Sequence, residues 1–247
     1  MAGLRVERSG GVVTATMDRP EKRNALDGPL FAALAELFSE AAGDDDTRVV
    51  VLTGAGGAFS SGGDLTPDEP SGDDVVTTMR RFGRTAQALH DLPKPVIAAV
   101  DGVAVGAGMS LALGCDLVVA SDRARFALMF VRNGLGLDLG GSWLLPRRVG
   151  SLKANELALL GDWVDAREAE RIGLVNRVVP ADALHGATME WAERLAASSP
   201  LALRTIKASL LRAADLTMAD AIEAEARAQA ECSASPEMRA ALEARRR

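Results

Sequence analysis

The stretch Gly54-Ala55-Gly56-Gly57-Ala58-Phe59-Ser60-Ser61-Gly62-Gly63-Asp64-Leu65 decides the fold of this chain. It follows the apolar run Val-Val-Val-Leu-Thr at 49–53, a pattern that predicts a buried strand. Glycine permits positive φ angles and close approach, and it leaves N–H groups free to point outward. We therefore expect the backbone, rather than a side chain, to face a ligand where this strand ends.

A second glycine bend, Gly106-Ala107-Gly108, lies between the apolar strand-like run 96–100 and the apolar helix-like run 109–113. The N–H groups at a helix N-terminus lack intrahelical acceptors and attract negative charge. Two backbone donors that converge from two strand ends can form an oxyanion hole. The alternative interpretation is two ordinary glycine turns. A dinucleotide-binding fingerprint is rejected, because the position that needs a third small residue is Leu111.

With Lys94-Pro95-Val96-Ile97-Ala98-Ala99-Val100-Asp101-Gly102, these two bends resemble the enoyl-CoA hydratase/isomerase (crotonase) superfamily. The resemblance runs from Arg19-Pro20-Glu21-Lys22-Arg23-Asn24-Ala25-Leu26 to the Pro200-Leu201-Ala202 segment, which is nearly the whole chain. Each motif alone is weak, whereas their order along the chain is specific.

The order of elements predicts an α/β fold. Strands are expected at 4–8, 12–17, 48–53, 96–100 and 117–120, with helices at 29–42, at 75–91 and from Gly106, and a short apolar stretch at 174–179. Such alternation implies crossover connections. The resemblance implies a spiral of repeated β-β-α units over residues 1–190. It also implies that a helical region over 191–247 joins chains into trimers, often paired as hexamers.

Bulk properties limit the classes of function. At 247 residues and 48% hydrophobic the chain can bury a full core, and its net charge of −6 argues against nucleic-acid binding. No apolar run reaches the length of a membrane span, and no leader pattern opens the sequence. Two cysteines, Cys115 and Cys232, give neither a disulfide framework nor a metal site. We expect a cytoplasmic protein without a metal.

The resemblance also implies a site for an acyl-CoA thioester. The oxyanion hole would use the N–H groups of Ser60 and Ala107. Lys22 and Arg23 would lie near the adenine-ribose end, where a phosphate-rich ligand needs local cations, although a solvated charged turn is the equal alternative. Asp64 could contact the ligand or stabilise its own loop. Coenzyme A would be part of the substrate, with no separate cofactor. The other residues expected to contact substrate are Ala25, Leu26, Ala58, Ser61, Gly62, Gly63, Leu65, Gly106, Phe130 and Trp143.

The acidic residues decide which reaction occurs. Hydratases of the resembled family carry two glutamates, which hold and activate one water. The corresponding positions here are Ser110 and Phe130, and neither side chain is a useful base. Asp138 lies where the dienoyl-CoA and epoxyphenylacetyl-CoA isomerase branches carry an aspartate facing the acyl chain. A double-bond shift needs only one such base, and an apolar pocket would raise its pKa toward a useful value.

Several alternatives stay open. Asp138 could simply cap the helix that follows it. The enzyme could be a specialised hydratase whose water is held by Asp138, Asp68 or Glu69, with 66–74 as a lid, or an acyl-CoA-binding protein without catalysis. A nucleophilic triad through His90 or His185 is rejected, because the chain has no elbow motif for the nucleophile.

Overall fold

The structure, a computed structural model, describes residues 3–66 and 74–244. Its main sheet has the strand order β1-β2-β3-β4-β6-β9, and a smaller sheet has the order β5-β7-β8. The first sheet contains β1 (Leu4–Ser9), β2 (Val12–Met17), β3 (Val49–Gly54), β4 (Val96–Val100), β6 (Leu117–Ser121) and β9 (Arg177–Val179). The second contains β5 (Val103–Val105), β7 (Arg125–Ala127) and β8 (Val164–Asp165). β1 and β2 form an antiparallel hairpin, and the remaining pairs of the first sheet are parallel.

Helices alternate with these strands. They are α1 (Gly28–Gly43), α2 (Val75–Asp91), α3 (Ala107–Gly114), α4 (Gly141–Leu160), α5 (Ala166–Arg171), α6 (Leu184–Ala196), α7 (Pro200–Ala213), α8 (Met218–Ser233) and α9 (Pro236–Ala244). The order β4-β5-α3 is followed by β6-β7-α4, and each unit gives one strand to each sheet before its helix. This confirms the expected spiral of β-β-α units.

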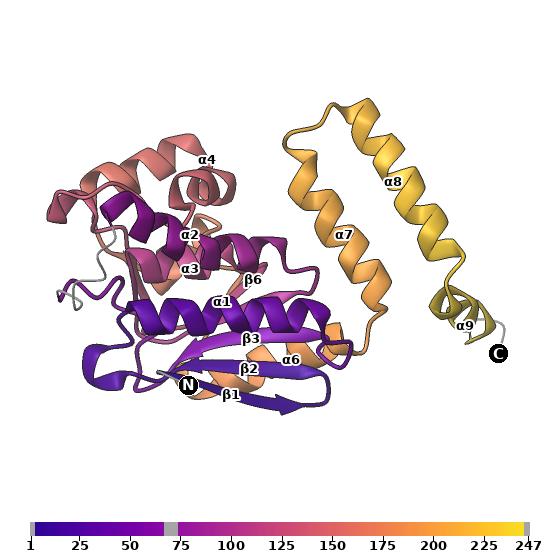
Figure 1. Cartoon of the computed structure of the whole chain (residues 1–247), viewed down its shortest axis with the longest axis horizontal. Coiled ribbons are helices and arrows are strands. Elements are labelled where there is room, and N and C mark those ends of the chain that lie inside the picture. Colours follow the sequence, from indigo (N-terminus) through magenta and orange to yellow (C-terminus); the bar gives the residue numbers. More distant parts are fainter. Residues whose placement is uncertain (1–2, 67–73, 245–247) are drawn as a thin grey trace.

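Both faces of the main sheet are buried, which explains the unbroken apolar runs of its central strands. Val50 and Leu52 of β3 pack in the large core with α1 and α3, whereas Val49 and Val51 pack in a second core with Ala192 of α6. Side chains alternate between faces along a strand, so a strand covered on both sides must be apolar throughout. Figure 1 shows α1 and α6 on opposite sides of β3.

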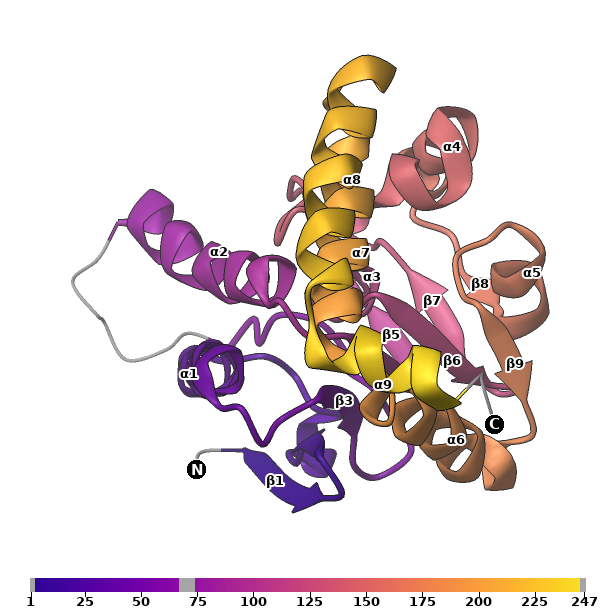
Figure 2. The ribbon, with the colours of Figure 1, turned by 90° about the vertical axis from the view of Figure 1, so that its right-hand side faces the viewer.

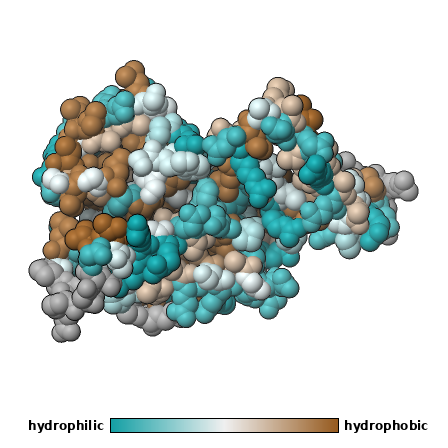
Figure 3. Space-filling view, turned by 45° about the horizontal axis from the view of Figure 1, so that its top comes forward, coloured by the Kyte–Doolittle hydropathy of each residue, from teal (hydrophilic) through white to brown (hydrophobic). Residues whose placement is uncertain are grey.

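Helices α7–α9, here called the C-terminal arm, extend away from the core (Figure 1), and they lie in front of it when the molecule is viewed from that side (Figure 2). α7 is tied to the core by Lys207, whose Nζ donates to Asp116 Oδ2 at 2.7 Å and to the Lys94 carbonyl at 3.0 Å. In the space-filling view a notch separates the arm from the core (Figure 3). Large apolar side chains on the arm are exposed: Ile206, Leu210, Met218 and Ile222.

Some details differ from the sequence-based expectations. The short strands β5, β7 and β8 were not predicted, because two or three residues are too few to show a periodicity. In the apolar stretch at 174–179 only residues 177–179 form a strand. α6 runs across the expected boundary at residue 190, so the core continues to the end of that helix. Among residues 3–66 and 74–244, no helix has both the length and the apolar character to cross a bilayer.

Candidate active site

The first glycine bend runs beside β5 and pairs with it. This pairing occupies the amide that we expected, from the sequence, to form part of the oxyanion hole. The N–H groups of Phe59 and Ser60 both donate to the Val103 carbonyl, at 3.1 and 2.9 Å, and the Val105 N–H donates to the Ser60 carbonyl at 2.9 Å. Ser60 is fully buried. The prediction that Ser60 supplies an oxyanion-hole N–H is therefore wrong, since that N–H is already satisfied within the fold.

Ser60 instead supports the next turn of the bend. Its Oγ donates to the Asn24 carbonyl at 2.8 Å and accepts the Gly62 N–H over a longer 3.2 Å. The Ser61 N–H donates to the Arg23 carbonyl at 2.9 Å. Within the described ranges no hydrogen bond occupies the N–H of Gly63. The Gly63 amide is thus the one that this bend can offer to a ligand.

The second bend places Ala107 at the first position of α3. Gly106 has a φ of +51°, and its N–H donates to the Ala127 carbonyl at 2.9 Å. The first N–H groups of a helix have no intrahelical acceptor, and the Ala107 N–H has no acceptor among the residues that the structure describes. Helix residues 107–113 are all buried, so water screens the positive end of the helix weakly.

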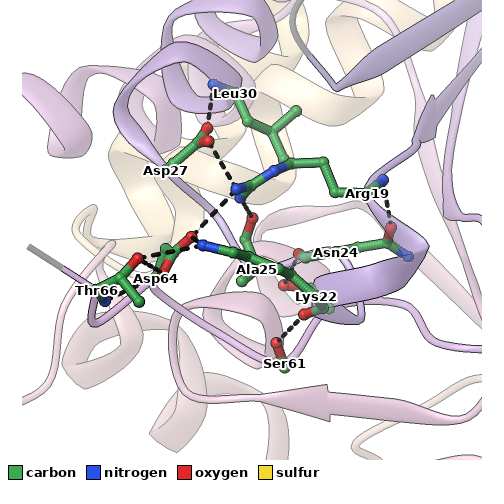
Figure 4. Close-up of polar contacts among 10 residues, drawn as sticks. Arg19, Lys22, Asn24, Ala25, Asp27, Leu30, Ser61, Asp64 and Thr66 are labelled. Carbon is green, nitrogen blue, oxygen red and sulfur yellow. Dashed lines mark hydrogen bonds and ion pairs between the residues drawn. The ribbon is translucent and has the colours of Figure 1, made fainter. Parts of the chain in front are cut away.

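A polar network joins the first bend to the loop at 19–27 (Figure 4). Asn24 is fully buried; its Nδ2 donates to the carbonyls of Ala55 (2.9 Å) and Ala58 (2.7 Å), and its Oδ1 accepts the Arg19 N–H at 2.9 Å. Sequence reasoning did not single out Asn24. The only signal was its position in the loop motif.

Asp64 is the second centre of this network. Its carboxylate accepts from the Thr66 hydroxyl, from Lys22 Nζ at 2.9 Å and from Arg19 Nη2 at 3.1 Å, and Arg19 also pairs with Asp27 at 3.0 Å. These contacts, the Thr66 hydroxyl first, hold the pKa of Asp64 well below its usual range. Of the two alternatives for Asp64, the geometry favours stabilisation of its own loop.

The two cations expected near coenzyme A differ in their surroundings. Lys22 is engaged with Asp64 and with the Thr66 hydroxyl, at 2.9 and 3.2 Å. Arg23 is exposed, and its side chain forms no ion pair with any residue of the described ranges. Arg23 is therefore the more available of the two for a phosphate.

Asp138 lies just before α4, with a carboxyl group that is largely withdrawn from water. Its Oδ1 is buried without a hydrogen-bond partner among the described residues. Burial raises the pKa of Asp138 from 3.8 to about 6. The helix cap is Gly140, so capping by the Asp138 side chain is ruled out. The backbone after it is strained, because Leu139 has a φ of +46° ahead of Gly140 at +77°.

A cavity of about 350 Å³ opens between α2, α3 and α4. Leu139 and Gly140, the two residues after Asp138, form part of its wall, and so does Ser110. Ser110 is buried and its Oγ has no partner in the described part of the chain. The cavity is lined by Gly83, Ala86, Gln87, Leu89, His90, Ser110, Leu111, Gly114, Leu139, Gly140, Trp143 and Leu144. His90, which the sequence analysis rejected as a member of a nucleophilic triad, thus lies in the wall of this cavity.

Other expected contact residues are placed as follows. The Phe130 ring lies against the second bend, 3.6 Å from where a Cβ on Gly106 would be. Trp143 lines the cavity, whereas Leu65 is 71% exposed. The expected small and apolar wall residues Ala25, Leu26 and Ala58 are buried. Asp68, Glu69 and most of the proposed lid at 66–74 lie outside the described residues.

Comparison with known proteins identifies the arrangement. The family model described as "Enoyl-CoA hydratase/isomerase" matches residues 7–246. The 1,2-epoxyphenylacetyl-CoA isomerase of Escherichia coli (strain K12) is 39% identical over 220 residues, covering 87% of this chain and 84% of that protein. The (E)-benzylidenesuccinyl-CoA hydratase of Thauera aromatica is 36% identical over 214 residues, covering 86% and 84%. A Thermobifida fusca YX structure in complex with CoA superposes with a TM-score of 0.89 at 33% identity, covering 94% and 93%.

In the described residues no group of three His, Cys, Asp or Glu side chains is arranged to hold a metal ion. The titratable group that combines burial, an unpartnered oxygen and a nearby cavity is Asp138. The arrangement can therefore offer backbone donors, one carboxyl group of raised pKa and an apolar space.

Proposed function

The chain belongs to the enoyl-CoA hydratase/isomerase family, and from this premise we propose that it is an enoyl-CoA isomerase. The observation that carries the choice is the lone Asp138 carboxyl group, buried on one oxygen and adjacent to the cavity wall. Ser110 and Phe130 occupy the two positions at which the resemblance places the glutamates of a hydratase. One base suffices to move a proton between two carbons, whereas hydration is helped by two carboxyl groups that hold water.

The reaction would begin with removal of a proton from the carbon next to the thioester. Asp138 accepts this proton, the electron pair of the broken C–H bond forms a double bond between that carbon and the thioester carbon, and the carbonyl pair moves onto the thioester oxygen. Asp138 then returns the proton to the γ-carbon, whose new C–H bond uses the electron pair of the original double bond. The pair between the thioester carbon and the α-carbon becomes the new α,β double bond as the oxygen pair restores the carbonyl. No atom is gained or lost, and coenzyme A enters only as part of the substrate.

Negative charge gathers on the thioester oxygen between the two proton transfers. We assign its stabilisation to the Ala107 N–H at the start of α3, with the second donor coming from the 62–63 turn. Preorganised amides in a buried site cost no reorganisation when the charge appears, which makes such donors effective. Arg23 supplies a cation for the phosphate groups of coenzyme A.

A carboxyl group with a pKa of about 6 suits the task. It is mostly ionised at neutral pH, and it is a stronger base than a carboxylate in water because its pKa is higher. Brønsted behaviour favours a catalytic group whose pKa lies near the operating pH.

A parallel assay separates the possible activities. A 3-enoyl-CoA and a 2-enoyl-CoA are supplied to the wild type, to Asp138→Asn and to Asp162→Asn, the control being a carboxylate that is 64% exposed. We expect isomerisation that falls about 10²–10⁴-fold with Asp138→Asn only. Hydration that survives this substitution would favour a hydratase, and tight CoA-ester binding without turnover would favour a non-catalytic binding protein.

We also propose that the chain forms trimers or hexamers through the C-terminal arm. The support is the exposed apolar residues of α7 and α8, including Leu210 at 73% and Met218 at 80%. Light scattering after size exclusion gives the assembly directly, and a wild-type mass equal to the 25.8 kDa of one chain would reject the proposal.

A further inference from the structure

Two aromatic side chains meet in the wall of the cavity beside Asp138. His90 of α2 and Trp143 of α4 have ring centroids 5.2 Å apart and planes at 85°, an edge-to-face arrangement. The Arg147 guanidinium lies 3.8 Å from the centroid of the Trp143 ring. A cation over an indole face is attracted by the ring's electrons, so the indole is held by both neighbours.

Two further cavities lie beyond this ring pair, against α7. They measure about 510 Å³ and about 430 Å³, and His90 and Trp143 line both of them as well as the cavity beside Asp138. Gly114 and Leu144 complete the wall between the first cavity and the larger of the two. The ring pair is therefore a partition between three spaces.

The space behind the partition has a wall that is apolar in part. The larger of the two cavities is lined by the apolar side chains of Leu113, Leu203 and Leu211 and also by charged ones, among them Asp116 and Lys207. If the rings were absent, the cavity beside Asp138 would continue into this space.

We propose that the His90–Trp143 pair sets the acyl length, so that the substrates carry a short acyl group and long unbranched chains are excluded. This inference rests on the proposed function for the placement of the acyl group next to Asp138. A cavity of about 350 Å³ is at the small end of ligand sites, and a long chain would have to displace an indole that is held on two sides.

Binding measurements with saturated esters test the partition without relying on turnover. Calorimetry compares hexanoyl-CoA with dodecanoyl-CoA on the wild type, on Trp143→Ala and on the matched control Trp163→Ala. Trp163 also carries an arginine over its ring, Arg125 at 4.5 Å, but it lines none of the three cavities. We expect the wild type and the control to prefer hexanoyl-CoA, and Trp143→Ala to bind dodecanoyl-CoA at least tenfold more tightly than the wild type does.

His90→Ala opens the same wall from α2 and serves if Trp143→Ala does not fold. Equal binding of the two esters by the wild type, or an unchanged preference in a folded partition variant, would overturn the inference. Failure of the proposed function looks different: the 3-enoyl-CoA is not isomerised, while the length preference and its loss in Trp143→Ala are still observed.

Discussion

Gly62 and Ala107 lie side by side where the two glycine bends meet. A Cβ carbon on Gly62 would be 3.8 Å from the Ala107 amide nitrogen and 2.9 Å from the Val105 carbonyl oxygen. Gly62 also has a φ of +101°, a conformation that other residues rarely adopt. The close approach of the two bends therefore depends on the absence of a side chain at this position.

Replacement of Gly62 by alanine should separate the bends. The new methyl group meets backbone rather than a movable side chain, so we expect kcat for the 3-enoyl-CoA to fall about 10²-fold, as small misplacements at a reacting centre do. Gly63→Ala is the matched control, because a Cβ there has nothing within 4 Å and Gly63 does not have a positive φ. Equal activity of the two variants would contradict the proposed role of the first bend.

Ala107→Pro removes one N–H from the second bend and little else. Proline is well tolerated at the first position of a helix, where the missing N–H has no intrahelical partner. We expect kcat to fall about 10²–10³-fold, the usual effect of losing one oxyanion donor. Ala107→Ser keeps the N–H and should retain activity. A fully active, folded proline variant would show that this amide does not stabilise the thioester oxygen.

The central fold was predictable because its strands are buried on both faces. Unbroken apolar runs such as 49–53 and 96–100 mark such strands without any knowledge of their neighbours. The second bend was also predictable from the sequence, because the first amides of a helix lack intrahelical acceptors wherever the helix packs. These features are local in the chain.

The misassignment of Ser60 has a non-local cause. The pairing with β5 decides whether the amide of residue 60 or that of a neighbour lacks an acceptor within the fold. β5 has only three residues, which are too few to show a periodicity in the sequence. The contact between His90 and Trp143 could not be predicted from the sequence either, because the two residues are 53 positions apart in the chain. Asp138 could be proposed from its motif, but its unpartnered oxygen could not.

Asn24→Ala should destabilise the protein as well as reduce activity. The substitution leaves the carbonyls of Ala55 and Ala58 without their buried donor and removes the acceptor of the Arg19 N–H. An unsatisfied buried polar group costs about 1–3 kcal/mol, so a loss of this order in the free energy of unfolding is expected from urea titration. Asn133→Ala, at an exposed position, is the control and should change little.

The pH dependence of turnover should report the Asp138 carboxyl group. Since the base must be ionised, kcat/KM for the 3-enoyl-CoA should rise with pH and level off above a pKa of about 6. Asp138→Glu retains a carboxyl group and should retain a shifted profile with reduced activity. A wild-type profile that is flat from about pH 5 to 8 would contradict the assignment of Asp138 as the base.

The same carboxyl group should lower the stability of the folded protein at neutral pH. Its pKa is about 6 in the fold against 3.8 ordinarily, so its contribution is fully favourable below 3.8 and is lost as the pH rises through about 6. Asp138→Asn cannot ionise. We therefore expect it to match the wild type near pH 3.8 and to exceed it in the free energy of unfolding above about pH 6, as measured by urea titration at both pH values. A difference between variant and wild type that does not change with pH would mean that the carboxyl group is open to water, and Asp138 would then lack the raised pKa that its role as base requires.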